Sequence, residues 1–314
     1  MRLNTTAINR TVRILVLVLL ISGGLFLPNC DEKKEPQNNP LAGYITVKGS
    51  EEILPAMMEA AYAFMDLYAK AKVLVVGGGS NPGLAAIFTD SAQIAISTRP
   101  LTETERKRAQ DAAFDVNEFK IAKDGIAVIV NQVNGIKQLT VDQVIRIFSG
   151  KITNWSEVKG PNYPIRVCVW DENSGTYAYV EDTILKGNKY APKVARFATT
   201  EEMIRYIYGN SGAIGMISMT RLYKSWSPMI EDIRIKAVAI GLDSKGPFVI
   251  PDEVTVHAGA YVFIRNIYLY TPREAKGLDA GFITYIMSTA GQKILAQNGL
   301  VPITIPVKYK KDSL

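Results

Sequence analysis

Short apolar runs alternate along this chain with stretches in which apolar residues recur at helical spacing. Ile45–Val47 is predicted to be a strand, and Glu51–Tyr68 then carries apolar residues every three or four positions, which is typical of an amphipathic helix. Ser50 precedes that helix and is predicted to be its N-cap. Val73–Val76 and Ile94–Ser97 follow as short strands. This alternation predicts an α/β fold.

The same alternation continues to the end of the chain. Asp124-Gly125 interrupts the longest predicted strand, and Pro272–Glu274 is predicted to enter a helix. The other predicted strands are Ile121–Asn131, Ile165–Trp170, Ser211–Ile217, Arg234–Ile240 and Val262–Tyr270. The other predicted helices are Leu84–Phe88, Thr102–Ala113 with a capping box from Thr102 to Glu105, Thr140–Phe148, Thr176–Leu185, Glu201–Tyr208 and Gly277–Ala296.

The first 30 residues are typical of an export signal. Basic residues precede the apolar run Ile14–Ile21, and Cys30 stands where a bacterial lipoprotein carries its lipidated cysteine. We therefore predict a lipoprotein signal peptide over residues 1–30 and a flexible tether over residues 31–43, which is polar and contains two prolines. Cleavage by ordinary signal peptidase, or an uncleaved anchor, are the alternatives.

Composition excludes several classes of function. The 314 residues are 47% hydrophobic and carry a net charge of +6, but three of the arginines lie in the predicted signal. The remainder has 33 basic and 30 acidic groups, so we expect no nucleic-acid partner. With His257 as the single histidine and two distant cysteines, we expect no metal site and no cofactor. Cys168 lies in an apolar strand and is predicted to be buried and inert.

The glycine-rich turns of this sequence match no catalytic motif. The stretch Gly78–Gly83 lacks the lysine of a P-loop, and the chain has no nucleophile elbow. Three strand–turn–helix junctions instead carry small hydroxyl residues, at Ser50, at Ser80 and at Ser174-Gly175-Thr176. Backbone N–H groups and hydroxyls at such junctions suit an anion, so these residues are predicted to line one ligand site.

The chain resembles the phosphate-binding proteins of bacterial high-affinity phosphate uptake, which have a periplasmic-binding-protein fold. The resemblance runs from about Ile45 to Pro302. It is carried by Leu139–Gln143, Ile147–Trp155, Ser174–Thr176, Gly212–Gly215, Arg265–Thr271, Gly291-Gln292 and Gly299–Pro302.

The resemblance implies a type II fold of two α/β lobes with the ligand cleft between them. Lobe 1 is expected over residues 44–123 and 259–307, lobe 2 over residues 124–258, and a polar tail over residues 308–314. It also implies a non-enzymatic, monomeric protein, periplasmic or at the cell surface. Such a protein captures phosphate or a related oxyanion and delivers it to an ABC permease and its ATPase.

Some expected phosphate contacts are replaced in this sequence. The family's Gly-Ser-Thr turn reads Gly49-Ser50-Glu51, its aspartate falls on Gln93, and its arginine falls on Trp170. Without this arginine, neutralisation of the ligand is expected to come from helix N-termini and hydroxyls, helped by Arg99. Glu51 and Trp170 also leave open a small organic or cationic ligand on the same fold. A sensor or structural lipoprotein and an exported hydrolase are the remaining alternatives.

Overall fold

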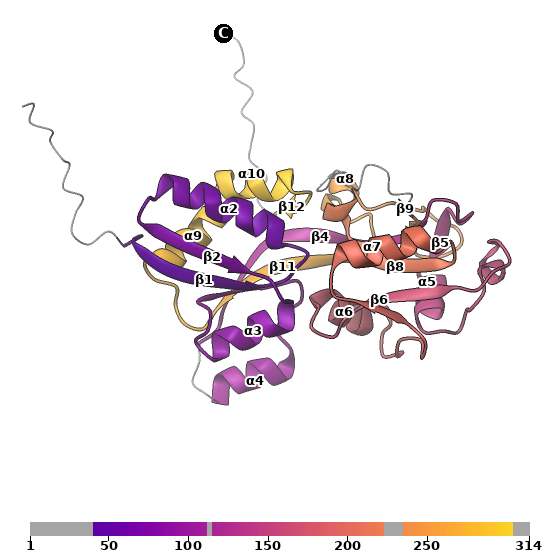
Figure 1. The fold of residues 1–314 in the computed structure, drawn as a ribbon, viewed down its shortest axis with the longest axis horizontal. Coiled ribbons are helices and arrows are strands. Elements are labelled where there is room, and N and C mark those ends of the chain that lie inside the picture. The colour runs from indigo at the N-terminus through magenta and orange to yellow at the C-terminus, as the bar shows by residue number, and fades with distance from the viewer. Residues whose placement is uncertain (1–39, 112–114, 223–234, 304–314) are drawn as a thin grey trace, which may run out of the picture. The chain divides into compact units, whose positions relative to one another are not determined.

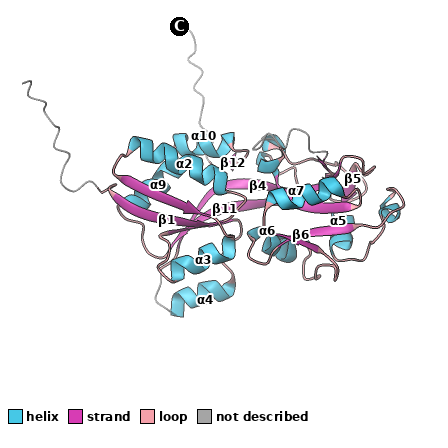
Figure 2. Ribbon diagram, in the orientation of Figure 1, coloured by secondary structure: helices cyan, strands magenta, loops and turns pink. Residues whose placement is uncertain are grey.

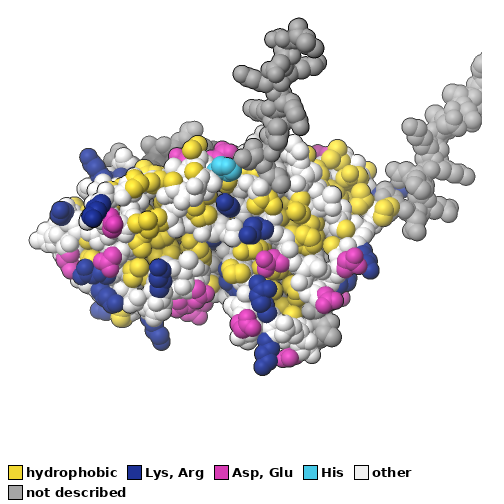
Figure 3. Space-filling model, turned by 180° about the vertical axis from the view of Figure 1, so that it is seen from behind, with side chains coloured by type: hydrophobic (Ala, Val, Ile, Leu, Met, Phe, Trp, Pro, Cys, Tyr) yellow, Lys and Arg dark blue, Asp and Glu magenta, His cyan; other side chains and the backbone are white. Residues whose placement is uncertain are grey.

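The computed structural model describes residues 40–111, 115–222 and 235–303 (Figures 1 and 2). Cys30, the predicted signal peptide, most of the tether and the predicted tail lie outside these residues. Within the described ranges, no helix is both long enough and apolar enough to cross a membrane. The face drawn in Figure 3 carries charged side chains of both signs, with hydrophobic side chains between them.

A ten-stranded sheet runs through the body in the order β2-β1-β3-β11-β4-β8-β6-β7, and β12 and β9 also pair with β4. Its first half consists of β1 (Gly43–Gly49), β2 (Ala71–Val76), β3 (Ile94–Ser97), β11 (Ile264–Thr271) and β12 (Val301–Pro302). Its second half consists of β6 (Arg166–Trp170), β7 (Ala195–Phe197), β8 (Ala213–Ser218) and β9 (Ile235–Ala237). A separate pair is formed by β5 (Gln138–Thr140) and β10 (Ala239–Gly241).

The long strand β4 (Asn117–Asn131) joins the two halves of the sheet. Its first part pairs with β11 up to Gly125, and from Ile126 it pairs with β8. The second part is buried on both faces, since Ile126 and Val128 pack in one core while Ala127 packs in another. This period of two explains the nearly continuous apolar run in the sequence.

Helices cover both faces of each half (Figure 1). In the first half, one face packs against α2 (Leu54–Leu67), α9 (Leu278–Met287) and α10 (Thr289–Gln297), and the other against α3 (Ser80–Phe88). The next element is α4 (Glu103–Asp111). The second half contains α5 (Val141–Phe148), η1 (Trp155–Val158), α6 (Gly175–Tyr179), η2 (Val180–Ile184), α7 (Thr200–Gly209), η3 (Met219–Arg221) and α8 (Glu253–His257). The molecule therefore has two α/β lobes, as predicted.

Two predictions about helix starts are wrong. The N-cap of α2 is Ile53 and not Ser50, because residues 51–53 form a turn before the helix begins. Pro272–Glu274 is not helical: the Thr271 hydroxyl donates to the carbonyl of Arg273, and α9 begins only at Leu278. The predicted helix Gly277–Ala296 is two helices, which Ser288 separates.

Two other local predictions are confirmed. The Thr102 hydroxyl accepts from the Glu105 N–H, and the Glu105 carboxylate accepts from the Thr102 N–H, which completes the capping box. Cys168 is fully buried in the core beside α7, and burial raises the pKa of its thiol to about 12. This thiol therefore stays protonated at neutral pH. His257 ends α8 as an exposed residue.

Candidate functional site

A cavity of about 230 Å³ lies beside the turns that follow β1, β2, β6 and β7. The strands β1 and β2 are parallel, and so are β6 and β7, so the cavity lies at carboxyl ends of strands from both lobes. This is where ligands bind in open α/β sheets. Its lining residues are Ser50, Glu51, Glu52, Gly78, Gly79, Trp170, Asp171, Ser174, Gly175, Ala198 and Thr199.

Five of the predicted site residues line this cavity: Ser50, Glu51, Trp170, Ser174 and Gly175. The structure therefore brings all three predicted junctions to the cavity wall, the second of them through Gly79 and not through Ser80. Its described lining is acidic, because it contains three carboxylates and no lysine, arginine or histidine. A dianion entering this cavity would meet negative charge unless a buried cation compensates for it.

The Ser174-Gly175-Thr176 turn begins α6. Ser174 is the N-cap, and its hydroxyl accepts from the Thr176 N–H at 3.0 Å. Thr176 is fully buried, and its side chain points away from this cap into a polar cluster described below. The turn thus presents Ser174 and Gly175 to the cavity and Thr176 to the interior.

Ser80 lies directly behind this turn and is fully buried. Its hydroxyl accepts from the Thr98 N–H at 3.1 Å and lies 3.3 Å from the Thr98 hydroxyl. A Cβ at Gly175 would overlap with both hydroxyl groups, so only glycine fits there. Ser80 therefore supports the wall of the cavity rather than lining it.

The two lobes also touch through the backbone next to this point. The Asn81 N–H donates to the carbonyl of Asn173 at 3.2 Å, and the Asn81 side chain donates to the carbonyl of Glu172 at 2.7 Å. Gly79 has a φ of 104°, and a Cβ there would lie 2.5 Å from the Asn173 carbonyl oxygen. The glycine-rich turn therefore lets the lobes approach closely.

Trp170 occupies the position at which the resemblance implied an arginine. It is 3% exposed, packs in the core beside α7, and lines the cavity. Its indole Nε1 donates to the carbonyl of Met216 at 2.7 Å. Its indole N–H is thereby satisfied, so Trp170 offers an apolar wall and no cation.

Gln93 and Arg99 are not among the described residues that line the cavity. Gln93 Oε1 accepts from the Thr46 N–H at 2.8 Å, which fixes the side chain along β1. Arg99 forms two bonds to the Glu105 carboxylate, at 2.8 and 2.7 Å, and two to Asn81 Oδ1, at 3.0 and 2.7 Å. These bonds hold the Arg99 guanidinium within lobe 1, and its predicted role in compensating for the missing arginine stays a prediction.

Arg265 is an arginine that contacts Thr176, one of the predicted ligand residues. Strand register places it directly opposite Asp124, where β4 and β11 pair. Its Nε and Nη2 donate to Asp124 Oδ2 at 3.0 and 2.7 Å, and the Ser218 hydroxyl donates to Asp124 Oδ1 at 2.8 Å. Arg265 is 3% exposed and Asp124 is fully buried, so this ion pair lies in the interior, where the two lobes join.

Glu52 reaches the same cluster from the turn after β1. One carboxylate oxygen accepts from Arg265 Nη2 at 3.1 Å and from the Thr176 hydroxyl, and the other accepts from the Ser218 N–H at 3.3 Å. The Thr176 hydroxyl also accepts from Arg265 Nη1. Glu52 is 4% exposed and yet lines the cavity. We call Glu52, Asp124, Thr176, Ser218 and Arg265 the interlobe cluster.

Burial and charge act in opposite directions in the interlobe cluster. Burial raises the pKa of Asp124, and the nearby charge of Arg265 only partly offsets this. Burial opposes the charge of Arg265, but the carboxylates of Glu52 and Asp124 outweigh it and raise the pKa of the guanidinium. One permanent positive charge thus faces two carboxylates.

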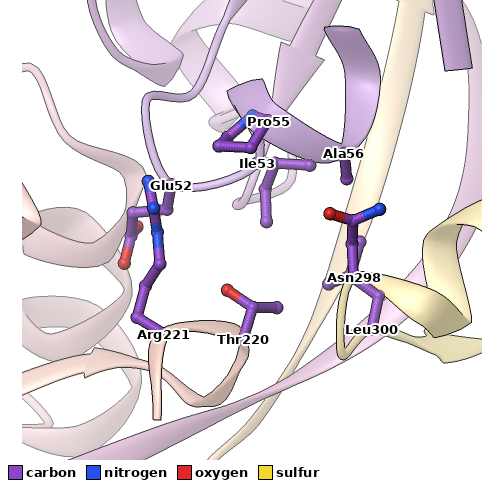
Figure 4. Close-up of a pocket in the computed structure, with 8 residues that line it drawn as sticks. All are labelled: Glu52, Ile53, Pro55, Ala56, Thr220, Arg221, Asn298 and Leu300. Atoms are coloured by element: carbon purple, nitrogen blue, oxygen red, sulfur yellow. The ribbon is translucent and has the colours of Figure 1, made fainter. Parts of the chain in front are cut away.

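Glu52 also borders a second, very small pocket of about 10 Å³ (Figure 4). In that view Arg221 extends from η3 toward Glu52, and Asn298 lies on the opposite side. A pocket of this size has room for about one water molecule. Glu52 therefore stands in the wall between the larger cavity and this pocket.

Sequence reasoning did not identify the interlobe cluster, apart from Thr176. A signal was present, because Asp124 directly precedes the apolar end of β4, Gly125–Val130, and Arg265 is the one charged residue of β11. Charged residues in buried strands need partners. Pairing the two strands would have paired the two charges. Glu52 and Thr98 gave no comparable signal.

Two lobes that present strand ends to a shared cavity are the architecture of a solute-binding protein. The chain belongs to the PBP superfamily, since the family model described as a PBP superfamily domain matches residues 34–290. It is similar to the phosphate-binding protein PstS of Bacillus subtilis, with 29% identity over 310 residues, 95% of this chain and 97% of that protein. The predicted family resemblance and fold are thereby confirmed.

Solved structures of phosphate-transport proteins are also similar to this chain. A structure from Clostridium perfringens, described as that of a phosphate ABC transporter substrate-binding protein with bound phosphate, has a TM-score of 0.73 and 26% identity. It is matched over its whole length and over 83% of this chain. An ABC-type phosphate transport receptor from Vibrio cholerae has a TM-score of 0.66 and 26% identity over the same shares.

Proposed function

We propose that this chain is the substrate-binding component of an ABC-type importer and that it captures phosphate or a related oxyanion. The observation that carries the proposal is the cavity between the lobes, where Ser50, Ser174 and Gly175 meet. Hydroxyl and N–H groups of this kind suit a tetrahedral oxyanion. The similar proteins from B. subtilis, C. perfringens and V. cholerae are described as phosphate-binding or phosphate-transporting.

In this proposal the protein performs no covalent chemistry. It is an exported monomer, anchored to a membrane through Cys30, and it passes its ligand to a permease that an ATPase drives. The lobes comprise residues 44–123 with 259–307, and residues 124–258. This division is supported by the core clusters, although Tyr261 and Phe263 still pack with the second lobe.

Titration calorimetry of the full chain with phosphate, sulfate, molybdate and tungstate tests the proposal. We expect saturable binding of phosphate or one of the other oxyanions, with one site per chain. The absence of heat with all four, at micromolar protein, would contradict it. The acidic lining of the cavity makes this test stringent, since a small cationic ligand is the alternative. Mass spectrometry of the ligand released from denatured native protein separates the two.

A further inference from the structure

The carboxylate of Glu52 accepts hydrogen bonds from three groups on three different elements. These groups are the Thr176 hydroxyl on α6, the Ser218 N–H on β8 and the Arg265 guanidinium on β11. A hydroxyl, a backbone N–H and a guanidinium together are the donors that a bound oxyanion uses. In this structure a side chain of the protein itself occupies them.

Glu52 also lies between these donors and the cavity. It lines the cavity, whereas Thr176, Ser218 and Arg265 are not among its described lining residues. An anion in the cavity therefore meets the Glu52 carboxylate before it reaches the guanidinium. The described cavity lining contains no cation. The guanidinium that bonds to Glu52 behind this lining is that of Arg265, while Arg221 borders the small pocket on the other side of Glu52.

The charge balance makes simultaneous binding unfavourable. Arg265 already faces the carboxylates of Glu52 and Asp124, at 3.1 and 2.7 Å. A further anion beside them would add a third negative charge to one guanidinium in a buried site, where charges are poorly screened. Replacing the Glu52 carboxylate by a bound anion is less costly, because Arg265 then still faces two negative groups and not three.

We propose that Glu52 is an internal competitor, whose carboxylate occupies the anion-binding donors and must leave them before an oxyanion binds. This inference rests on the proposed function and names a residue that sets the affinity of the site. Glu52 comes from lobe 1, while Thr176 and Ser218 belong to lobe 2, so the same bonds tie the lobes together without ligand. Glu52 thereby weakens the binding of every oxyanion that needs these donors.

Titration calorimetry with inorganic phosphate on the full chain, its Glu52→Gln variant and its Glu51→Gln variant tests this inference. Glutamine keeps the shape of Glu52 and removes its charge, so the wall between the cavity and the small pocket stays intact. We expect E52Q to bind phosphate about 10- to 100-fold more tightly than the unmodified chain, the value of a hydrogen bond to a charged group.

Glu51 is the matched control. It lines the same cavity, but no hydrogen bond joins it to the interlobe cluster within the described residues. Removing its charge relieves repulsion at the cavity wall without freeing any donor of the interlobe cluster, so we expect E51Q to raise the phosphate affinity, but by less than about fivefold. An equal gain in E51Q and E52Q would overturn the inference, since repulsion would then account for both.

The outcomes separate the inference from the proposed function. If the unmodified chain binds phosphate and E52Q gains nothing, the inference fails while the proposed function stands. If only E52Q binds phosphate, the inference is supported and the proposed function of the natural chain fails. If no protein binds, both fail. Thermal unfolding checks that each variant is folded, and Glu52→Ser replaces E52Q if the glutamine variant does not fold.

Discussion

Two arginines near the cavity, Arg99 and Arg265, have opposite roles in its architecture. Arg99 lies next to the predicted ligand groups in sequence, but Glu105 and Asn81 hold its guanidinium within lobe 1. Arg265 is 166 positions further along the chain, yet β11 carries it to Thr176 and Glu52. The difference shows that strand register, and not proximity in sequence, decides which arginine reaches the groups behind the cavity. Four substitutions or conditions test this contrast.

The largest effect is expected from replacing Arg265. Arg265→Met leaves Asp124 and Glu52 without their positive partner in the interior, and we expect a loss of about 3–5 kcal/mol of unfolding free energy. Urea unfolding followed by circular dichroism measures it. A loss below about 1 kcal/mol, the range of surface pairs, would show that the interlobe cluster is not the buried charge network described here.

A smaller effect is expected at Thr176. Thr176→Val keeps the shape of the side chain and removes the hydroxyl that Glu52 and Arg265 share. We expect phosphate affinity to fall by about tenfold or more, as for a lost hydrogen bond to a charged group. Calorimetry measures this change, and an unchanged affinity would place the anion away from the interlobe cluster.

Replacing Arg99 tests the second arginine of this comparison, which is expected to matter for stability and not for binding. Arg99→Met removes the bond to Glu105, whose side chain is 23% exposed, and we expect a loss of about 1 kcal/mol of unfolding free energy. Phosphate affinity should stay within about twofold, since Arg99 does not line the cavity. A large loss of affinity with little loss of stability would restore Arg99 as a ligand.

The smallest effect is a difference in pH dependence. Burial alone would raise the pKa of Glu105, but hydrogen bonds from Arg99 and Thr102 outweigh it and lower the pKa below its usual 4.5. A lowered pKa in the folded state adds stability above pH 4.5, which is lost as the pH falls through the folded pKa.

The contribution of Asp124 to stability changes with pH in the opposite direction. Burial raises the pKa of Asp124 above 3.8, so its contribution to stability decreases as the pH rises from 3.8 through the folded pKa. Urea unfolding across this range, on the unmodified chain and on Glu105→Gln, measures the Glu105 part as their difference. A difference that grows toward low pH would contradict the assignment.

Much of the fold was predictable because its signals are local. The apolar runs, the capping box at Thr102 and the small-residue turn at Ser174 are each set by neighbouring residues. The start of α2 was not predictable in this way. A serine before a helical pattern usually caps it, but the turn over residues 51–53 is fixed by Glu52, whose partners lie more than 120 positions away.

The candidate site was predictable only in part, for the same reason. One cavity is lined by five residues that the sequence analysis named as site residues, and their contact with a ligand stays a prediction: Ser50, Glu51, Trp170, Ser174 and Gly175. The cation behind this acidic cavity is Arg265. Its position depends on the register of β4 against β11, which pairs it with Asp124. Register follows from the pairing of the whole sheet and not from any short motif.

A crystal structure of the chain grown with phosphate tests the central claim most directly. The account predicts a tetrahedral anion that accepts hydrogen bonds from Thr176 and the Ser174-Gly175 turn, with the Glu52 carboxylate displaced from Arg265. A structure in which Glu52 still bonds to Thr176 and Arg265, and the cavity holds no anion at saturating phosphate, would contradict it.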